Sequence, residues 1–215
     1  MSAWPTPQNL ADELVEAGFT KPSTSRLTSA LALAVEAFQD ATGWYPFAAQ
    51  EDAEAAESTL TWPADSAVSV IELGGGVLSS TTPTLTISGD ALTAGTDFEL
   101  RPVDAPRKSQ PYTYLKLRGR VLSGNSELKL TGIWGYCDAT SVPELARAAV
   151  LAYAARDIAA PQVQSGAATR PVSEAKEGDV SRQYGTNIEE RQAAIRQWAG
   201  DWDAGTKRFT RQRII

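Results

Sequence analysis

The sequence predicts an α+β protein in which N- and C-terminal helices form a bundle and an antiparallel β-sheet or sandwich is inserted between them. Apolar residues recur at helical spacing near both ends of the 215-residue chain, and they alternate with polar residues between Thr59 and Trp134. Each terminal helix has an apolar stripe too narrow to be stable alone. We therefore expect the two ends of the chain to pack together.

The sequence pattern predicts two helices in the N-terminal part of the chain. Residues 6–17 form the first, with Thr6 as its cap and with Leu10, Leu14 and Val15 facing inward. The second runs from about residue 24 to residue 42, and Gly43 ends it. Its predicted inward stripe consists of Leu27, Ala30, Leu31, Ala34, Val35 and Phe38.

The aromatic segment 44–47 follows this second helix. Its simplest interpretation is an anchor that holds the helix end in the core, and ligand stacking is the alternative. Residues 48–58 are acidic and rich in alanine, which indicates a linker or a frayed helix.

The middle of the chain predicts a series of short strands rich in Val, Ile, Thr and aromatic residues. Glycine- and proline-containing segments separate them, and the run Gly74-Gly75-Gly76 is expected to be a hairpin turn. A phosphate-binding loop is disfavoured, because no Gly-Lys-Ser/Thr follows this run. The candidate strands are residues 58–62, 68–73, 84–88, 97–101, 112–118 and 127–134.

An alanine-rich helix is predicted over residues 141–160. Ser141 is a suitable N-cap, Glu144 completes a capping box, and Pro161 ends the helix. Small side chains let other helices approach closely, so we expect this helix at the centre of the bundle. Its predicted inward positions are Leu145, Ala149, Ala152 and Tyr153.

A polar stretch over residues 162–187 leads to the last helix, and its length predicts a segment that is mobile or ordered by a neighbouring chain. The last helix is expected to begin at Thr186 or Asn187 and to end at Gly205. Its apolar side would consist of Ile188, Ile195, Trp198 and Trp202.

These predicted elements divide the chain into three parts. Residues 1–57 and 135–205 form the helical bundle, residues 58–134 form the inserted β domain, and residues 206–215 form a basic C-terminal tail.

The composition disfavours catalysis, and we expect a protein that is not an enzyme and that binds no cofactor and no metal. Because histidine is absent and cysteine occurs once, the commonest general base, metal ligand and activated nucleophiles are missing. Asp201 and Asp203 lie two residues apart, so a helix would direct them to different faces, and we interpret them as solvated.

The sequence also bears on where the protein resides. No apolar run reaches the roughly 18 residues that span a bilayer, and the N-terminus has no secretory signal. The single cysteine, Cys137, fits a reducing cytoplasm.

Charge is distributed unevenly along the chain. Residues 1–60 contain nine acids and two bases, whereas residues 141–215 contain nine acids and eleven bases. The last ten residues include Lys207, Arg208, Arg211 and Arg213 and no acid. This asymmetry predicts directional contacts with different partners, and the alternative is a solvated surface followed by a frayed tail.

The order of these features resembles the head–tail connector (adaptor, or head completion) family of tailed bacteriophages. Five segments carry the resemblance over most of the chain: the helix end at residues 42–47, the strand pair at 60–71, residues 95–100, residues 130–144, and the alanine-rich helix followed by residues 177–184.

This resemblance implies a structural virion protein that is in the host cytoplasm before assembly and then resides in the neck of the particle. Members of the family form a ring, commonly of twelve copies, beneath the portal protein. Such a ring extends the DNA channel and contacts the next neck or tail-completion protein. Genomic DNA would pass through it without sequence-specific binding, and no membrane would be involved.

The resemblance also directs attention to two sets of residues. C-terminal segments of the family often bind the portal, which suggests a docking peptide with basic residues and apolar anchors: Lys207, Arg208, Phe209, Arg211, Arg213, Ile214 and Ile215. The acidic N-terminal part could line the channel, because like charge prevents phosphate binding. Its candidate residues are Asp12, Glu13 and Glu16.

Two other functions remain open at this point. A carbohydrate- or surface-binding β module on a helical stalk would use the aromatic residues Tyr112, Tyr114 and Trp134. A hydrolase that uses carboxylates would need two convergent acids with separated pKa values, and no pair in the sequence suggests them.

Overall fold

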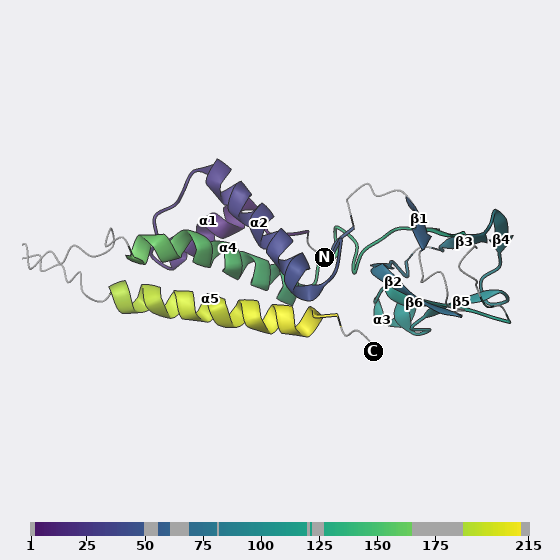
Figure 1. Ribbon diagram of the computed structural model, residues 1–215. Helices are drawn as coiled ribbons and strands as arrows, with labels where there is room; N and C mark the ends of the chain where they lie inside the picture. The colour runs from purple at the N-terminus through teal and green to yellow at the C-terminus, as the bar shows by residue number, and fades with distance from the viewer. Residues whose placement is uncertain are drawn as a thin grey trace, which may run out of the picture. The chain divides into compact units, whose positions relative to one another are not determined.

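The computed structural model describes residues 3–49, 56–60, 69–80, 82–119, 121, 127–164 and 187–211. The chain divides into two compact units (Figure 1). The sheet unit comprises Met1–Ala3 and Gly43–Val142, and the helical unit comprises Trp4–Thr42 and Pro143–Ile215. The predicted α+β class, with terminal helices and an inserted antiparallel β structure, is confirmed. The predicted domain boundaries at residues 57/58 and 134/135 lie inside the sheet unit.

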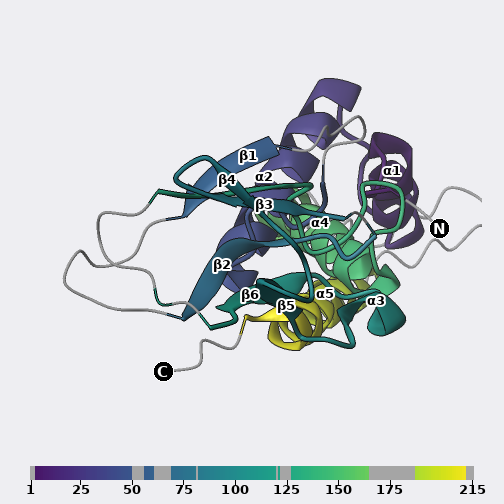
Figure 2. The same ribbon diagram turned by 90° about the vertical axis from the view of Figure 1, so that its right-hand side faces the viewer.

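The helical unit contains α1 (Pro7–Glu16), α2 (Thr24–Thr42), α4 (Glu144–Gln164) and α5 (Asn187–Phe209). Figures 1 and 2 show α4 between α2 and α5. The alanines of α4 are buried, among them Ala146, Ala149 and Ala155. Small side chains therefore let α2 and α5 pack closely against α4, and the predicted central position of this helix is confirmed. Among the described residues, no helix combines the length and the apolar character that crossing a membrane requires.

The first helix begins with the predicted cap. The Thr6 side chain accepts a hydrogen bond from the Asn9 backbone N–H, and the Asn9 side chain accepts one from the Thr6 backbone N–H, which completes a capping box. Leu10 and Leu14 are buried, but Val15 is 55% exposed and does not face inward as predicted. Val15 follows Leu14 directly, so it points about 100° away from the stripe that Leu10 and Leu14 form. The predicted stripe of α2 is buried except for Val35, which is half-buried.

Both predicted ends of α4 differ from the structure. The helix begins at Glu144, and the Pro143 carbonyl accepts hydrogen bonds from the N–H groups of Ala146 and Arg147. Ser141 is therefore not the cap, and its N–H instead donates to the Asp138 carbonyl in the preceding turn. Pro161 lies inside the helix, which continues to Gln164.

A tertiary contact holds the last turn of α4, and one residue of its first turn differs from the prediction. The Gln162 side chain accepts a hydrogen bond from the Thr20 backbone N–H over 3.3 Å, which ties the last turn of α4 to the segment after α1. Leu145 is 40% exposed and does not face inward as predicted, whereas Ala146, the next residue in the same turn, is fully buried.

The last helix also extends beyond its predicted end. Gly205 lies inside α5 and is buried, and the helix ends at Phe209. A Cβ atom at position 205 would overlap the Ala149 Cβ and lie 3.0 Å from the Leu145 carbonyl oxygen. The glycine therefore marks close contact between α5 and α4, and the first four residues of the predicted tail belong to the helix.

The sheet unit contains two antiparallel sheets. One has the strand order β1 (Ala56–Leu60), β7 (Leu128–Gly132), β3 (Thr84–Ile87) and β4 (Asp90–Leu92), and the other has the order β2 (Val70–Val77), β6 (Tyr112–Leu117) and β5 (Phe98–Arg101). Strand β4 and the short helix α3 (Ala105–Lys108) were not predicted. Both sheets contribute to one apolar cluster, which consists of Ile71, Leu73, Val77, Leu85, Phe98, Leu115, Leu117, Leu128 and Leu130.

The three glycines at 74–76 lie inside β2, so the predicted hairpin turn is wrong. The pairing of β2 with β6 shifts register between Glu72 and Val77, which identifies an irregularity of the β-bulge type. A Cβ at Gly75 would lie 2.6 Å from the Tyr45 carbonyl oxygen, and Gly76 has a φ of +71°. The glycines thus let β2 pass directly against the backbone of the segment that follows α2.

The aromatic segment 44–47 packs within the sheet unit. Trp44 and Phe47 are buried, and their ring centroids lie 5.1 Å and 4.9 Å from that of Tyr136. The Ala49 N–H donates to the Cys137 carbonyl, which joins this segment to the chain that follows β7. The two segments that connect the units are therefore paired with each other.

Candidate assembly surfaces

The predicted portal-docking residues begin in the last turn of α5. Lys207 and Arg208 are exposed on this turn, and Arg211 is half-buried just beyond it. Arg213, Ile214 and Ile215 lie outside the described residues. The positive charges of Lys207 and Arg208 in the last turn interact favourably with the partial negative charge at the C-terminus of the helix. Their position therefore also stabilises α5.

Phe209 faces the interior of the helical unit. Its ring centroid lies 6.2 Å from that of Phe38, which is fully buried. The rings of Trp202 and Trp4 also pack edge-on against Phe38, each with a centroid distance of 6.0 Å. Phe38 is thus the centre of an aromatic cluster that holds the C-terminal end of α5 against α2.

The backbone after α5 is also attached to α2. The Arg211 N–H donates a hydrogen bond of 2.9 Å to the Thr42 carbonyl, one of the carbonyls that the end of α2 leaves without a helical partner. The Thr42 hydroxyl donates to the Phe38 carbonyl over 2.7 Å. The chain is therefore fixed to the helical unit as far as Arg211, two residues beyond the end of α5.

The three predicted channel acids have different environments on α1. Asp12 and Glu16 are exposed and lie one helical turn apart. Asp12 accepts a hydrogen bond from the Gln8 side chain. Glu13, by contrast, is half-buried and accepts a 2.7 Å hydrogen bond from the indole N–H of the buried Trp198 on α5. Glu13 thus connects α1 to α5, whereas Asp12 and Glu16 face solvent.

We expect the Glu13–Trp198 hydrogen bond to contribute about 1.5–3 kcal/mol to the free energy of unfolding, because its acceptor is charged and its donor is buried. A double-mutant cycle with Glu13→Gln and Trp198→Phe, followed by urea unfolding, measures this coupling. The substitution Glu16→Gln is the control, since Glu16 is exposed on the same helix, and it should change stability by less than about 0.5 kcal/mol. A coupling energy near zero would contradict the prediction.

A second set of contacts attaches the start of α5 to the segment between α1 and α2. The Arg191 guanidinium lies 5.4 Å from the centroid of the Phe19 ring and donates a hydrogen bond to the Gly18 carbonyl. The Phe19 ring packs against Trp198 at 5.8 Å. The N-terminal half of α5 is therefore held against the segment that follows α1, and its C-terminal end is held near the end of α2.

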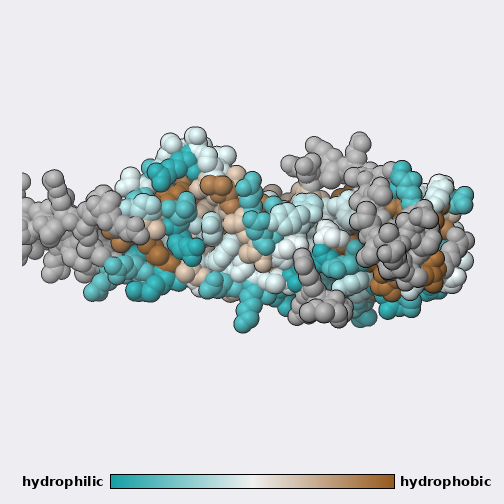
Figure 3. Space-filling view, viewed as in Figure 1, coloured by the Kyte–Doolittle hydropathy of each residue, from teal (hydrophilic) through white to brown (hydrophobic). Residues whose placement is uncertain are grey.

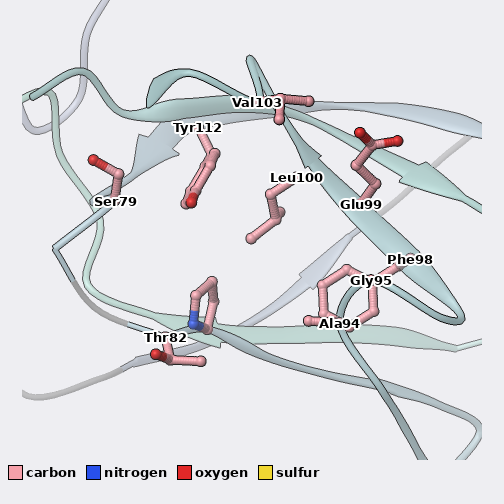
Figure 4. Close-up of a pocket in the computed structure, with 10 residues that line it drawn as sticks. Ser79, Thr82, Ala94, Gly95, Phe98, Glu99, Leu100, Val103 and Tyr112 are labelled. Carbon is pink, nitrogen blue, oxygen red and sulfur yellow. The ribbon is translucent and has the colours of Figure 1, made fainter. Parts of the chain in front are cut away.

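The sheet unit has a small open pocket of about 280 Å³ (Figure 4). Tyr112 and Leu100 project toward its middle, Thr82 lies on the opposite side, and Glu99 and Val103 lie at its rim. Its remaining lining residues are Ser79, Pro83, Ala94, Gly95 and Phe98. This lining is mainly apolar with a few hydroxyl groups. Such a lining suits the binding of an apolar side chain better than it suits catalysis.

Glu99 is the one carboxylate in the lining of this pocket, and two arginines surround it. Its carboxylate lies 3.3 Å from the Arg101 guanidinium and 3.5 Å from that of Arg118. Desolvation raises the pKa of Glu99, but hydrogen bonds and charge from Arg101 and Arg118 outweigh it, so the pKa is lowered overall. An ionised carboxylate that is already paired is a poor proton donor and a poor base for catalysis.

Cys137 is buried in the sheet unit, and its Sγ lies 3.7 Å from the Phe47 carbonyl oxygen. Desolvation, with a smaller contribution from the charge of Asp138, raises the pKa of this thiol from 9.0 to about 12. The thiol therefore stays protonated, which disfavours a nucleophilic role.

The raised pKa of Cys137 predicts a loss of stability at alkaline pH. Between about pH 9 and pH 12 the thiol ionises in the unfolded chain but keeps its proton in the folded one. Raising the pH therefore favours unfolding, by up to about 1.4 kcal/mol for each pH unit in this window. Urea unfolding of the wild type and of Cys137→Ser from pH 8 to pH 11 measures the effect, and the serine variant should show the smaller decline. Equal declines would contradict it.

The aromatic residues proposed for a carbohydrate site do not form an exposed platform. Tyr112 and Trp134 pack against the core between the two sheets, and Tyr114 is half-buried on β6. A stacking site for sugars needs exposed ring faces. The structure therefore offers no support for the carbohydrate-binding alternative.

In the part of the chain that the structure describes, no group of three or more Cys, Asp or Glu side chains could hold a metal ion. Asp201 and Asp203 lie on α5, half-buried and exposed respectively, and form no such group.

Sequence reasoning missed two features of these surfaces. The indole N–H of Trp198 and the carboxylate of Glu13 are 185 residues apart in sequence, and only the packing of α1 on α5 joins them. The pocket combines residues of β5 and β6 with residues of separate loops, so no local motif marks it. Phe209 was predicted as a docking anchor, and its spacing of seven residues from Trp202 could have shown that both lie on one face of α5.

Comparison with known proteins finds similarity in structure but not in sequence. No family model matches the chain, and no curated protein matches it. Among solved structures, a chain in the neck of an empty GTA particle, computed with C6 symmetry, matches over 100% of this chain and 95% of its own length, with 15% identity and a TM-score of 0.50. The chain has the fold of a GTA neck protein. The predicted resemblance to head–tail connectors is thereby confirmed at the level of the fold.

Two further structures show weaker similarity to this neck fold. A chain in the neck of a native GTA particle, computed with C12 symmetry, has 14% identity and a TM-score of 0.46, with 100% of this chain and 96% of that chain covered. A chain in the virion of a native gene transfer agent (GTA) particle has 17% identity and a TM-score of 0.47, with 91% and 89% covered.

Proposed function

We propose that this protein is a structural component of the neck of a phage-like particle, where it forms a ring beneath the portal protein. The observation that carries the proposal is the similarity in fold to a chain in the neck of a GTA particle, over 100% of this chain and 95% of that chain. The helical unit supports it, because hydrogen-bonded and aromatic contacts hold α5 near both of its ends. A ring subunit needs a fixed shape, so that its surfaces match those of its neighbours. It does not need to catalyse a reaction.

The basic end of α5 is the proposed site for the portal. Lys207 and Arg208 present positive charge there, and the Arg211–Thr42 hydrogen bond fixes the point from which residues 212–215 continue. Phe209 serves this site indirectly, since it packs against Phe38. The docking segment proposed from the sequence is therefore divided: Phe209 positions it, and the side chains of Lys207, Arg208, Arg211, Arg213, Ile214 and Ile215 would contact the portal.

The acidic surface of α1 is the proposed lining of the DNA channel. Asp12 and Glu16 are exposed and would repel phosphates, so that DNA slides without binding. Glu13 is less suited to this role, because Trp198 occupies its carboxylate. The partner on the far side of the ring would be the next neck or tail-completion protein, and the ring would contain about twelve copies, as is common in the family that the sequence resembles.

The portal proposal predicts that removing residues 212–215 abolishes binding to portal rings and leaves the subunit folded. The deletion begins after Arg211, because a deletion from residue 206 would also remove Phe209 from the aromatic cluster. Mass measurement of the protein alone and mixed with portal rings tests the prediction, and circular dichroism shows whether the variant folds. Portal binding that is unchanged by the deletion would refute the docking site, and a full-length protein that binds no portal would refute the neck function itself.

The channel proposal is tested by reversing charge at Asp12 and Glu16. The double substitution Asp12→Lys and Glu16→Lys should slow DNA packaging or ejection, because lysines bind phosphates. The double substitution Glu36→Lys and Asp40→Lys on the exposed face of α2 is the control, since it makes the same change of charge on another helix. Equal rates in all three proteins would contradict the assignment of α1 to the channel.

A further inference from the structure

The chain passes between the helical unit and the sheet unit at the ends of two helices. Apart from its first three residues, which belong to the sheet unit, it crosses from Thr42 to Gly43 and returns from Val142 to Pro143. The first crossing directly follows the end of α2, and the second directly precedes the start of α4 at Glu144. A few backbone torsions therefore set the direction in which the chain leaves each helix.

In the sheet unit, several contacts fix the segments that lead to these crossings. The N–H groups of Tyr136 and Cys137 donate to the Phe47 carbonyl over 2.8 and 3.1 Å. Trp44 is buried, and its ring packs against that of Tyr136. Between Trp44 and the end of α2 lies only Gly43, which is exposed and has a φ of +76°, a conformation that glycine adopts without strain.

The peptide group that joins Thr42 to Gly43 is held by the other end of the chain. Its oxygen is the Thr42 carbonyl, which accepts the 2.9 Å hydrogen bond from the Arg211 N–H. Because a peptide group is planar, a hydrogen bond to its oxygen fixes the orientation of the whole group. The Thr42 hydroxyl also donates to the Phe38 carbonyl, which closes the last turn of α2. Without the bond from Arg211, the peptide group would turn about the ψ torsion of Thr42.

Arg211 is kept near this peptide group by the end of α5. Phe209 packs against Phe38, and the C-terminal ends of α2 and α5 lie side by side (Figure 1). Residues 212–215, which belong to the proposed portal-docking segment, follow Arg211 directly. The docking segment therefore begins one residue after the donor that holds the Thr42 carbonyl.

We propose that the Arg211–Thr42 hydrogen bond is a restraint that couples the C-terminal segment to the crossing at Gly43. While the bond is made, the peptide group between Thr42 and Gly43 keeps one orientation, which limits rotation of the two units about this crossing. When residues 212–215 bind a partner, the backbone of Arg211 is held from both sides, so the bond opens less often and the restraint becomes stronger. The inference rests on the proposed function, because it takes the portal as this partner.

Distances between spin labels in the free protein test the restraint. The labels are attached at Leu33→Cys in the helical unit and at Val103→Cys in the sheet unit, because these side chains are 59% and 65% exposed. Figure 3 shows small hydrophobic patches among hydrophilic side chains over α2, so a label on this surface leaves the core intact. The native Cys137 stays in place, because its buried thiol reacts poorly with the label.

Two proline variants and one alanine variant separate the N–H of Arg211 from its side chain. Arg211→Pro removes the N–H and should make the distribution of distances about twice as broad. Arg211→Ala keeps the N–H, and Gln212→Pro introduces proline one residue later, so both should retain the width of the wild type. Equal widths for Arg211→Pro and Arg211→Ala would overturn the proposal.

Amide hydrogen exchange in the wild type gives a result that does not depend on how the variants fold. The Arg211 amide should exchange at least about ten times more slowly than an amide in an unstructured peptide. Exchange at the unstructured rate would overturn the proposal. Tryptophan fluorescence shows whether the aromatic cluster around Phe38 is intact in the Arg211→Pro protein.

Adding portal rings distinguishes the restraint from the neck function. On portal rings the distribution of distances in the wild type should become narrower, and that of Arg211→Pro should stay broad. If the wild type binds the portal and its distribution keeps the width of the free protein, the coupling is wrong and the neck function stands. If no portal is bound but the free variants differ as expected, the restraint stands and the neck function is wrong.

Discussion

Replacing Gly205 with alanine is expected to lower the free energy of unfolding of the helical unit by about 1–3 kcal/mol. The new Cβ would overlap that of Ala149 and approach the Leu145 carbonyl oxygen to 3.0 Å, so α5 has to move away from α4. This cost opposes the gain of about 1 kcal/mol that alanine normally brings over glycine inside a helix. Urea unfolding followed by circular dichroism measures the net effect.

Gly200→Ala is the matched control for this substitution. Gly200 lies in the same helix but is exposed, and a Cβ there meets no atom within 4 Å. We expect this variant to be more stable than the wild type by about 0.5–1 kcal/mol. Two variants with the same sign of change would show that contact with α4 does not decide the effect at position 205.

Phe38→Ala is expected to have the largest effect on stability, a loss of about 3–5 kcal/mol. Phe38 is fully buried, and the rings of Trp4, Trp202 and Phe209 all pack against it. Its removal leaves a cavity at the point where the end of α5 joins α2. Thermal unfolding and tryptophan fluorescence measure the change, because two of the three contacting rings are tryptophans.

Leu33→Ala is the control for the loss of Phe38. Leu33 lies on the opposite side of α2 and is 59% exposed, so its truncation should change stability by less than about 0.5 kcal/mol. A loss of less than about 1 kcal/mol for Phe38→Ala would contradict the role of Phe38 as the centre of the cluster. The result also bears on function, since Phe38 and Phe209 position the basic end that is proposed to bind the portal.

Local sequence signals predicted most of the elements correctly. The capping box at Thr6, the apolar stripe of α2 and the start of α5 at Asn187 depend on residues within a few positions of each other, so their chemistry is visible in the sequence. The six predicted strands overlap observed strands for the same reason. Strand β4 was missed because its three residues are too few to show alternation.

The predictions from the sequence were wrong where contact with a distant segment decides the role of a residue. Glycine normally ends a helix or forms a turn, but Gly205 and Gly75 are required because another backbone lies against them. Pro161 normally stops a helix, but it lies near the natural end of α4 and the side chain of Gln162 holds the last turn in place. Propensity is a weak guide at such positions, because tertiary contacts outweigh it.

The candidate assembly surfaces were predicted in part. The charge asymmetry of the chain directed attention to Lys207 and Arg208, and the structure shows both exposed at the end of α5. It also shows that Phe209 and Glu13, which the sequence grouped with their exposed neighbours, form internal contacts. Spacing along one helix cannot reveal which face another helix covers.

The amino-acid order alone therefore established that terminal helices enclose a β insertion and that the chain has few groups suited to catalysis, because periodicity and composition are local properties. Tertiary structure alone decided which glycines mark contacts, which charged residues face solvent, and that the backbone after α5 is attached to α2 at Arg211. These depend on the approach of α5 to α4 and α2, segments far apart in sequence whose positions follow from burial of a shared core.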